Sequence, residues 1–378
     1  MLNIAIAGDV CATGINERAF ADGNAAQIFG DLADTFRAAD LAIVNLESPL
    51  YAQPCGIRKS GPVLGVPEAC VAGLVAGRIN VVGLANNHSM DHSWTGLRNT
   101  IRVCREHGMA TVGAGANLAE ARRIHVEHIK GVRIGVLAVA EREFGIAGRS
   151  KWGVNPLDPI DFARNVRAHA SQLDFLIVLV HGGNEHLHYP RPTLVDTCRF
   201  FIEEGADVVL CQHSHCIGCI EQYQDGYIVY GQGNLIFDSP RASSSWREGG
   251  VVCIALDADR RFSAEFIPVE QRLGVPGVRR FDQERSQSIL NAIDERSRAL
   301  KDPDLLERYW REFCQSQKDL YLRRLGTHNR FGRGVDRLLR NVQSRYARSW
   351  KLRAEQLNLI RCESHREALI NILSDGFE

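Results

Sequence analysis

The sequence predicts a layered α/β fold, and three observations support this prediction. Short apolar runs alternate with helical patterns from Met1 to about Val269, as expected when strands and helices pack in layers. Five of these runs end in a side chain that can bind a metal or transfer a proton: Ile4–Asp9, Leu41–Glu47, Ile79–His88, Phe175–His181 and Ala206–His215. The 378 residues can bury a full core and leave room for a smaller second part.

The composition is that of an ordinary globular protein. Apolar residues make up 45% and charged residues 24% of the chain, and no apolar run has the roughly eighteen residues that a membrane helix needs. The chain enters a strand directly, without the basic segment and cleavage site of an export signal. Eleven cysteines without a framework spacing favour a reducing compartment. We therefore expect a cytoplasmic protein whose contact with a membrane is at most peripheral.

Helical spacing predicts four helices before the last strands. They cover Ala25–Arg37, Asp91–Cys104, Pro159–Gln172 and Pro192–Glu204. In the second helix, the expected buried stripe consists of Trp94, Leu97, Ile101 and Cys104. The fourth helix ends at Gly205, where a left-handed cap is expected.

The remaining strands and a change in composition complete the predicted order. Strands are expected at Val132–Val139, Gly226–Phe237, Gly250–Leu256 and Phe262–Val269. The stretch Glu141–Pro156 has no periodicity and contains three glycines, so we expect a mobile loop over a site. Helical patterns take over near Leu273, which predicts one domain over residues 1–272 and a basic, mainly helical region over 273–378.

The strongest single motif is His213-Ser-His215, which follows a buried strand. Residues i and i+2 of a strand point the same way, so both imidazoles can reach one ion. A structural zinc knot from Cys211, His213, Cys216 and Cys219 is an alternative, but it leaves the other strand ends unexplained.

Taken alone, each of the other strand ends also has a structural explanation. Asp9 could cap a helix, Glu47 could pair with an arginine, and His181 could be a core histidine. The Asn86-Asn87-His88 segment could be a turn. Together, the two carboxylates, the amide with its neighbouring histidine, and the three other histidines match the oxygen and nitrogen ligands of a two-metal hydrolytic centre.

The order of these residues resembles that of the calcineurin-like metallophosphoesterases, and more closely that of the CapA family of capsule and poly-γ-glutamate synthesis proteins. The motifs that carry the resemblance are Gly8-Asp9-Val10, Asn45-Leu46-Glu47, Ala85-Asn86-Asn87-His88, His181-Gly-x-x-Glu185, Gly205–Val209 and Tyr230–Asp238. The resemblance covers roughly residues 1–270. It implies an α/β/β/α sandwich of the metallophosphoesterase type.

The resemblance also implies a role for each residue. Two divalent ions (Mn, Fe or Zn) would be held, the first by Asp9 and His215, the second by Asn87, His181 and His213, with Glu47 bridging. A metal-bridging hydroxide would be the nucleophile, and His88 would be the general acid. Two positions depart from the family pattern: Cys11 stands where a histidine ligand is usual, and Gln212 stands where glycine is common.

Five further residues are candidates for contacts around the metals or the substrate. Asn45 lies on the same side of its strand as Glu47, and Lys59 is a candidate contact for an anion. Glu185 could reach a substrate amine or a histidine ligand. Asn234 and Asp238 are expected to fix the loop beside His213.

Three functions follow as hypotheses: a phosphoesterase, a hydrolase acting on an anionic envelope polymer or its precursor, and a non-catalytic accessory protein. The expected partners are an anionic small molecule or polymer and other proteins of polymer synthesis. From Tyr321 to Arg353 there are ten basic residues and one acid, in helical spacing. They predict either a solvated helix face or a contact with an anionic polymer, lipid headgroup or partner. Nucleic acid is not expected, because no aromatic-interleaved basic platform accompanies the charge.

Overall fold

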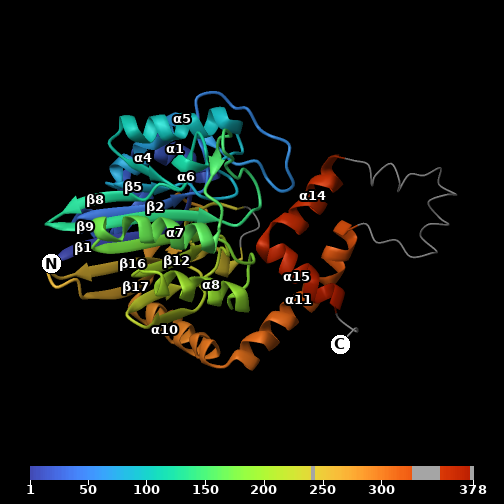
Figure 1. Ribbon diagram of the computed structural model, residues 1–378. Coiled ribbons are helices and arrows are strands. Elements are labelled where there is room, and N and C mark those ends of the chain that lie inside the picture. Colours follow the sequence, from blue (N-terminus) through green and yellow to red (C-terminus); the bar gives the residue numbers. More distant parts are fainter. Residues whose placement is uncertain (240–242, 326–349, 375–378) are drawn as a thin grey trace.

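The protein is described from a computed structural model, which covers residues 1–239, 243–325 and 350–374. Its core is two β-sheets packed face to face and covered by helices on both outer sides (Figure 1). No helix in the described part of the chain is long and apolar enough to cross a membrane.

The first sheet has eight strands in the order β18-β17-β16-β1-β2-β5-β6, with β15 also paired to β1. Its strands are β1 (Leu2–Cys11), β2 (Leu41–Leu46), β5 (Val81–Gly83), β6 (Ala110–Val112), β15 (Asn234–Phe237), β16 (Glu248–Leu256), β17 (Phe262–Gln271) and β18 (Val278–Arg280). The strands β1, β2, β5 and β6 run parallel, so their carboxyl ends lie at one edge of the sheet.

The second sheet has six strands in the order β13-β14-β12-β11-β9-β8. They are β8 (His125–Ile129), β9 (Val132–Ala140), β11 (Phe175–His181), β12 (Val208–Gln212), β13 (Ile220–Tyr223) and β14 (Gly226–Val229). The central strands β9, β11, β12 and β14 are parallel.

Alternation along the buried strands divides the core into layers. In β11, Phe175, Ile177 and Leu179 lie in the cluster shared by the two sheets. Leu176 and Val178 lie in the cluster beneath helices α7 (Pro159–His169) and α8 (Pro192–Glu203). Successive strand residues point to opposite faces, so a strand between two layers must be apolar on both. This arrangement confirms the predicted α/β/β/α sandwich.

The outer face of the first sheet is covered by short helices and one long one. These are α1 (Glu17–Ala21), α2 (Ala25–Phe29), α3 (Ala33–Ala38), α4 (Val71–Ala76) and α5 (Ser93–Glu106). The predicted single helix Ala25–Arg37 is wrong, because Gly30 has φ 53° and a 3-10 turn separates α2 from α3. In α5, Leu97 and Cys104 are buried as predicted, but Trp94 is 45% exposed and does not belong to the buried stripe.

Two further predictions need correction. The stretch Gly226–Phe237 forms two strands in different sheets, because β14 pairs with β12 whereas β15 pairs with β1. The stretch Glu141–Pro156 contains the short strand β10 (Gly153–Val154) paired with β7 (Ala114–Gly115). The cap at Gly205 is confirmed by its φ of 108°.

The C-terminal region continues the first sheet before it becomes helical. β18 pairs with β17, and the chain then forms α10 (Gln283–Ser297), α11 (Pro303–Leu325), α14 (Trp350–Arg361) and α15 (Glu363–Ser374). The last three helices share a small apolar cluster that includes Trp310, Leu359 and Leu369. The predicted division at residue 273 stays a prediction. Most of the basic segment Tyr321–Arg353 lies outside the described residues.

Candidate metal centre

The predicted site residues from both sheets come together at one edge of the sandwich. Asp9 lies near the end of β1, Glu47 follows β2, and His181 ends β11. The turn after β5 holds Asn87 and His88, and the segment after β12 holds His213 and His215. All seven side chains are buried. The strands β1, β2 and β5 of one sheet are parallel, as are β11 and β12 of the other, and the two sheets are stacked, so strand ends more than two hundred residues apart in the chain share this edge.

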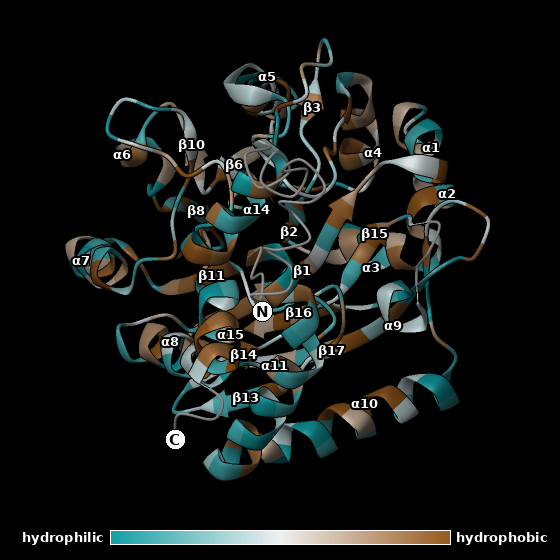
Figure 2. Cartoon of the chain, turned by 90° about the vertical axis from the view of Figure 1, so that its right-hand side faces the viewer, coloured by the Kyte–Doolittle hydropathy of each residue, from teal (hydrophilic) through white to brown (hydrophobic). Residues whose placement is uncertain are grey.

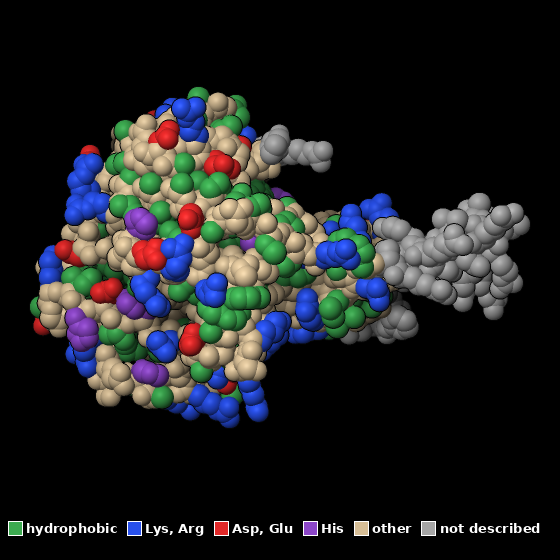
Figure 3. All heavy atoms as spheres, turned by 90° about the horizontal axis from the view of Figure 1, so that it is seen from above, with side chains coloured by type: hydrophobic (Ala, Val, Ile, Leu, Met, Phe, Trp, Pro, Cys, Tyr) green, Lys and Arg blue, Asp and Glu red, His purple; other side chains and the backbone are tan. Residues whose placement is uncertain are grey.

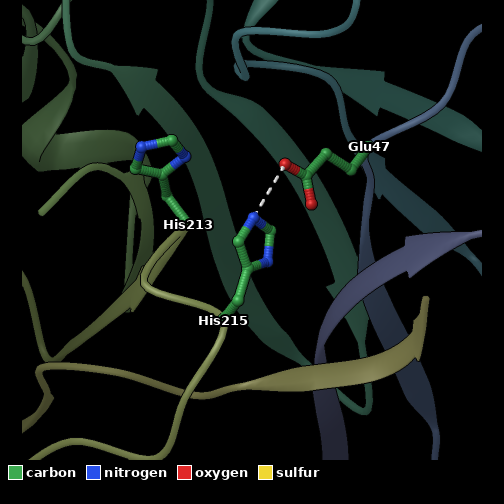
Figure 4. Close-up of side chains that lie close together, drawn as sticks. All are labelled: Glu47, His213 and His215. Carbon is green, nitrogen blue, oxygen red and sulfur yellow. Dashed lines mark ion pairs between the residues drawn. The ribbon is translucent and has the colours of Figure 1, made fainter. Parts of the chain in front are cut away.

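The distances define a compact cluster. Figure 4 shows Glu47, His213 and His215 pointing toward one another, and one ligand atom of each lies within 4.8 Å of the others. Glu47 Oε1 is 3.7 Å from His215 Nε2 and 3.6 Å from His181 Nε2. His181 Nε2 is also 3.1 Å from both Asn87 Oδ1 and His213 Nδ1.

Asp9 contacts this cluster through His213 and His215. Its Oδ2 is 3.5 Å from His215 Nδ1 and accepts a hydrogen bond of 3.2 Å from the backbone N–H of His213. Its Oδ1 accepts a hydrogen bond of 2.7 Å from Asn45 Nδ2. Asn45 therefore orients the carboxylate.

A divalent cation fits the charges and the unpartnered atoms of the cluster. Both carboxylate oxygens of Glu47 are buried and make no hydrogen bond. Burial, followed by the charge of Asp9, raises the pKa of Glu47 well above its ordinary value. Burial also raises the pKa of Asp9 to about 6. An ionised carboxylate that is buried without a cation destabilises the fold, so burial favours the protonated form. A bound metal ion would favour the ionised form instead.

The histidines are in the form that metal ligands require. Burial, followed by the charge of His213, lowers the pKa of His181 well below its ordinary value. Burial likewise lowers the pKa of His215 to about 3. Neutral imidazoles with buried carboxylates and an amide oxygen make a donor set suited to Mn, Fe or Zn.

The backbone after β12 brings the two histidines together in a way that strand geometry does not. The strand ends at Gln212, and His213 and His215 have φ values of 91° and 52°. Left-handed backbone at a non-glycine residue costs about 1–3 kcal/mol, and such strain clusters at functional sites. The expected reason for the convergence, alternation along a strand, is therefore wrong, although the two side chains do converge.

His88 belongs to a buried network that the sequence did not reveal. Its Nδ1 is 2.6 Å from Asp91 Oδ2. Lys59 Nζ donates to Asp91 Oδ1 at 2.6 Å and to the Asn87 carbonyl at 3.0 Å. The predicted anion contact from Lys59 stays a prediction, because its ammonium is already held by Asp91. The spacing of three residues between His88 and Asp91 is the available signal, but the sequence pattern predicts that Asp91 begins a helix.

The remaining candidates lie at different depths around the cluster. Asn234 Oδ1 is 2.9 Å from His215 Nδ1, so it fixes that ring, and Trp246, which sequence reasoning missed, lies against the same ring with centroids 4.3 Å apart. Asp238 accepts a hydrogen bond from the Ile15 backbone N–H at 3.2 Å and fixes the loop after β1. Glu185 is exposed at the edge of the site.

The alternative zinc knot is not formed. Cys211 Sγ lies 3.5 Å from Cys198 Sγ in α8, on the helix-covered face of the second sheet. Among the described residues, the group of histidine, cysteine and acidic side chains that could hold an ion is Glu47, His213 and His215. Cys11 is buried with its Sγ 3.3 Å from Thr13 Oγ1, and burial raises the pKa of its thiol to about 11.

Comparisons with known proteins identify the family of the chain. A family model described as "Bacterial capsule synthesis protein PGA_cap" matches residues 3–239. The "PGA biosynthesis protein CapA" of Bacillus subtilis is 26% identical over 298 residues, which cover 78% of each chain. A Mycobacterium tuberculosis protein described as a "probable polyglutamine synthesis accessory protein" is 31% identical over 214 residues, covering 53% of this chain and 56% of that protein.

Two solved structures show a weaker similarity to this chain. The NAD nucleotidase of Haemophilus influenzae has a TM-score of 0.42 and 13% identity, covering 82% of this chain and 59% of that one. A 5'-nucleotidase of Candida albicans has a TM-score of 0.40 and 13% identity, covering 70% of this chain and 51% of that one. Similarity at this level does not define a shared activity.

Proposed function

The chain belongs to the bacterial capsule synthesis protein family, and we propose that it acts in that setting as a metal-dependent hydrolase. Its substrate would be a phosphate ester or a related bond in a precursor of an anionic envelope polymer such as poly-γ-glutamate. Other proteins of polymer synthesis would be its partners. The cytoplasmic setting expected from the sequence remains a prediction.

One observation carries this proposal. Glu47 is fully buried, both of its carboxylate oxygens lack a hydrogen bond, and three histidines surround it. A purely structural carboxylate would be paired or bonded, because an uncompensated buried charge costs several kcal/mol. The unpartnered oxygens support a role as the carboxylate shared by two divalent ions.

The other residues would hold those ions and the substrate. Asp9 and His215 would hold one ion, and Asn87, His181 and His213 the other. Bound divalent ions (Mn, Fe or Zn) would supply Lewis acidity toward a phosphoryl oxygen and activate water. Asp91, in contact with Nδ1, would stabilise the imidazolium form of His88, whose Nε2–H would then give its proton to a leaving group.

The test combines metal analysis with hydrolysis of p-nitrophenyl phosphate by the Mn-loaded protein. The parent should hold two ions per chain and turn over, and Glu47→Gln should lose metal and activity together. His88→Asn should keep its metal and lose turnover by roughly 10²–10⁴-fold, the usual contribution of a general acid. His128→Asn, on the exposed part of β8, is the matched control and should behave as the parent. A parent without metal or turnover would contradict the proposal.

A second candidate function is a non-catalytic accessory protein, because the Mycobacterium tuberculosis relative is described as one. Cys11, where the family resemblance implies a histidine ligand, favours it as well. Such a protein would contain no transition metal after careful purification and would still bind poly-γ-glutamate. Metal content therefore discriminates between the two functions.

A further inference from the structure

The C-terminal helices lie against the edge of the sandwich that carries the metal centre. Figure 1 shows α14 and α15 beyond the carboxyl ends of the parallel strands. Figure 2, viewed from that side, shows both helices in front of the strands. Figure 3 shows the same helices as an arm with Lys and Arg side chains over much of its visible surface. The family model ends at residue 239, so these helices are outside the matched part.

A buried carboxylate fixes α15 to the loop that follows His181. Glu141 Oε1 accepts from the Gly183 backbone N–H at 3.0 Å, and its Oε2 accepts from the Ser364 backbone N–H at 3.0 Å. Arg191 Nη1 lies 2.8 Å from Glu141 Oε1. Burial alone would raise the pKa of Glu141, but the charge of Arg191 and the hydrogen bonds from Ser364 together outweigh it and lower the pKa to about 2. The carboxylate therefore stays charged and rigidly paired.

The same loop contacts both the helices and the histidine segment. Asn184 Nδ2 donates to the Ser364 carbonyl at 3.5 Å, and the His186 backbone N–H donates to the Ser214 carbonyl at 2.8 Å. Glu185 stands between these two anchors, so its backbone is held beside the metal centre. Its side chain is exposed, and no hydrogen bond or ion pair to it is found within the described ranges.

Residues of α15, α11 and the loop after β9 meet around His365. His365 Nδ1 is 2.8 Å from the Tyr321 hydroxyl, and its Nε2 is 4.0 Å from Glu143 Oε1. The His365 side chain is 20% exposed. His365 lies close enough to His213 and Glu185 for their charges to act on its imidazole. Burial lowers the pKa of His365, so it adds no positive charge there at neutral pH.

The lysine and arginine side chains around the site are already paired. The nearby cations Lys59, Arg142 and Arg191 are each committed to carboxylates, namely Asp91, Glu363 and Glu141. The exposed side chain of Glu185 has no positive partner among the described residues, so its carboxylate is ionised at neutral pH and unmatched. An unmatched carboxylate beside a metal centre is complementary to a substrate that carries a positive group near its reacting bond.

We propose that Glu185 binds the ammonium group of an amine-bearing substrate, with Glu143 and His365 forming the facing wall of this subsite. This inference rests on the proposed hydrolase function and gives it a substrate class. The C-terminal helices, fixed through Glu141, would position the wall. The free amino end of a glutamate chain is one group of this kind.

The test uses two phosphate esters of the same size, O-phosphoethanolamine and n-propyl phosphate, which differ by an ammonium in place of a methyl group. With the Mn-loaded protein, the ratio of their kcat/KM values should favour the amine by about 10- to 100-fold, as expected for one charged hydrogen bond. Glu185→Gln should bring the ratio close to one by slowing the amine ester alone. Glu185→Lys should invert the preference. Glu265→Gln, on the exposed part of β17, is the matched control.

Metal content should be equal in the parent, Glu185→Gln, Glu185→Lys and Glu265→Gln. Equal metal content would show that a changed substrate preference comes from recognition and not from loss of the metal ions. Calorimetric binding of the two esters is measured in parallel and does not depend on turnover. If neither ester is cleaved, phosphoesterase activity is refuted and binding alone decides the subsite. Equal binding of the two esters, absence of binding, or a preference that survives in Glu185→Gln would overturn the assignment of Glu185.

Discussion

Asp9→Asn should stabilise the metal-free protein while weakening its response to metal. The carboxyl is fully buried, and burial raises its pKa from 3.8 to about 6. At 1.36 kcal/mol per pKa unit, this rise of about 2 units means that ionised Asp9 destabilises the folded protein by about 3 kcal/mol. Asparagine has the same shape and no charge, so it removes this cost.

The substitution also has a cost of its own. Two donors, Asn45 Nδ2 and the His213 backbone N–H, point at the Asp9 oxygens, and an amide offers only one acceptor. Losing one hydrogen bond costs about 1 kcal/mol. The expected net gain in the free energy of unfolding is therefore about 2 kcal/mol at pH 8 without metal.

The pH dependence has a definite sign. A carboxyl whose folded pKa is raised binds more protons in the folded state, so its destabilising effect is absent below pH 3.8 and complete above about pH 6. The advantage of the variant should accordingly appear as the pH rises through this window. With Mn²⁺ at one hundred times its dissociation constant the parent should gain about 2.7 kcal/mol and the variant much less.

Urea unfolding of both proteins at pH 4 and pH 8, with chelator and with Mn²⁺, measures these four differences. Asp22→Asn, in an exposed ion pair with Arg18, is the control and should change stability by less than about 0.5 kcal/mol throughout. The reasoning would be refuted if Asp9→Asn were less stable than the parent at pH 8 in chelator, or if both proteins responded equally to Mn²⁺.

Three further outcomes are expected. Asp91→Asn should keep its metal, measured by elemental analysis, but lower kcat by about 10- to 100-fold because His88 loses its charged partner; unchanged kcat would exclude that role. Arg191→Met should lower the free energy of unfolding by about 3–5 kcal/mol, because it leaves Glu141 buried without its cation; a loss under 1 kcal/mol in urea unfolding would contradict this. Gly8→Ala should lower the melting temperature strongly, since its Cβ would lie 2.1 Å from the Gly233 carbonyl oxygen; a parent-like melting temperature would show that the backbone can move.

The layers could be predicted from the apolar runs, because a strand that is buried on both faces is apolar at nearly every position. A strand such as Phe175–His181 must be apolar at every position when a sheet packs on one side and helices on the other. The polar residues that end these runs could be identified for the same reason. A charged side chain directly after a buried strand needs a partner, so Asp9, Glu47 and His181 stood out from ordinary surface residues.

Local turns were harder to predict, because their energies depend on contacts from elsewhere in the chain. The helix predicted over Ala25–Arg37 is broken at Gly30, whose Cβ position lies 2.9 Å from the Val278 carbonyl oxygen of β18. Trp94 fits a helical stripe by spacing, yet it faces Trp152 at the surface, with ring centroids 6.4 Å apart. Periodicity tells which face of a helix is apolar, but not whether the protein covers it.

The sequence by itself determined the layered fold and most of the residues gathered at the candidate metal centre, because both follow from the order of buried strands and the polar side chains after them. Only the tertiary structure decided how those side chains are held. Asp91 beneath His88, Trp246 against His215, and Ser364 bonded to Glu141 join residues through space without any regular spacing. Such contacts depend on where strands and helices end in three dimensions, and chain order alone does not specify those positions.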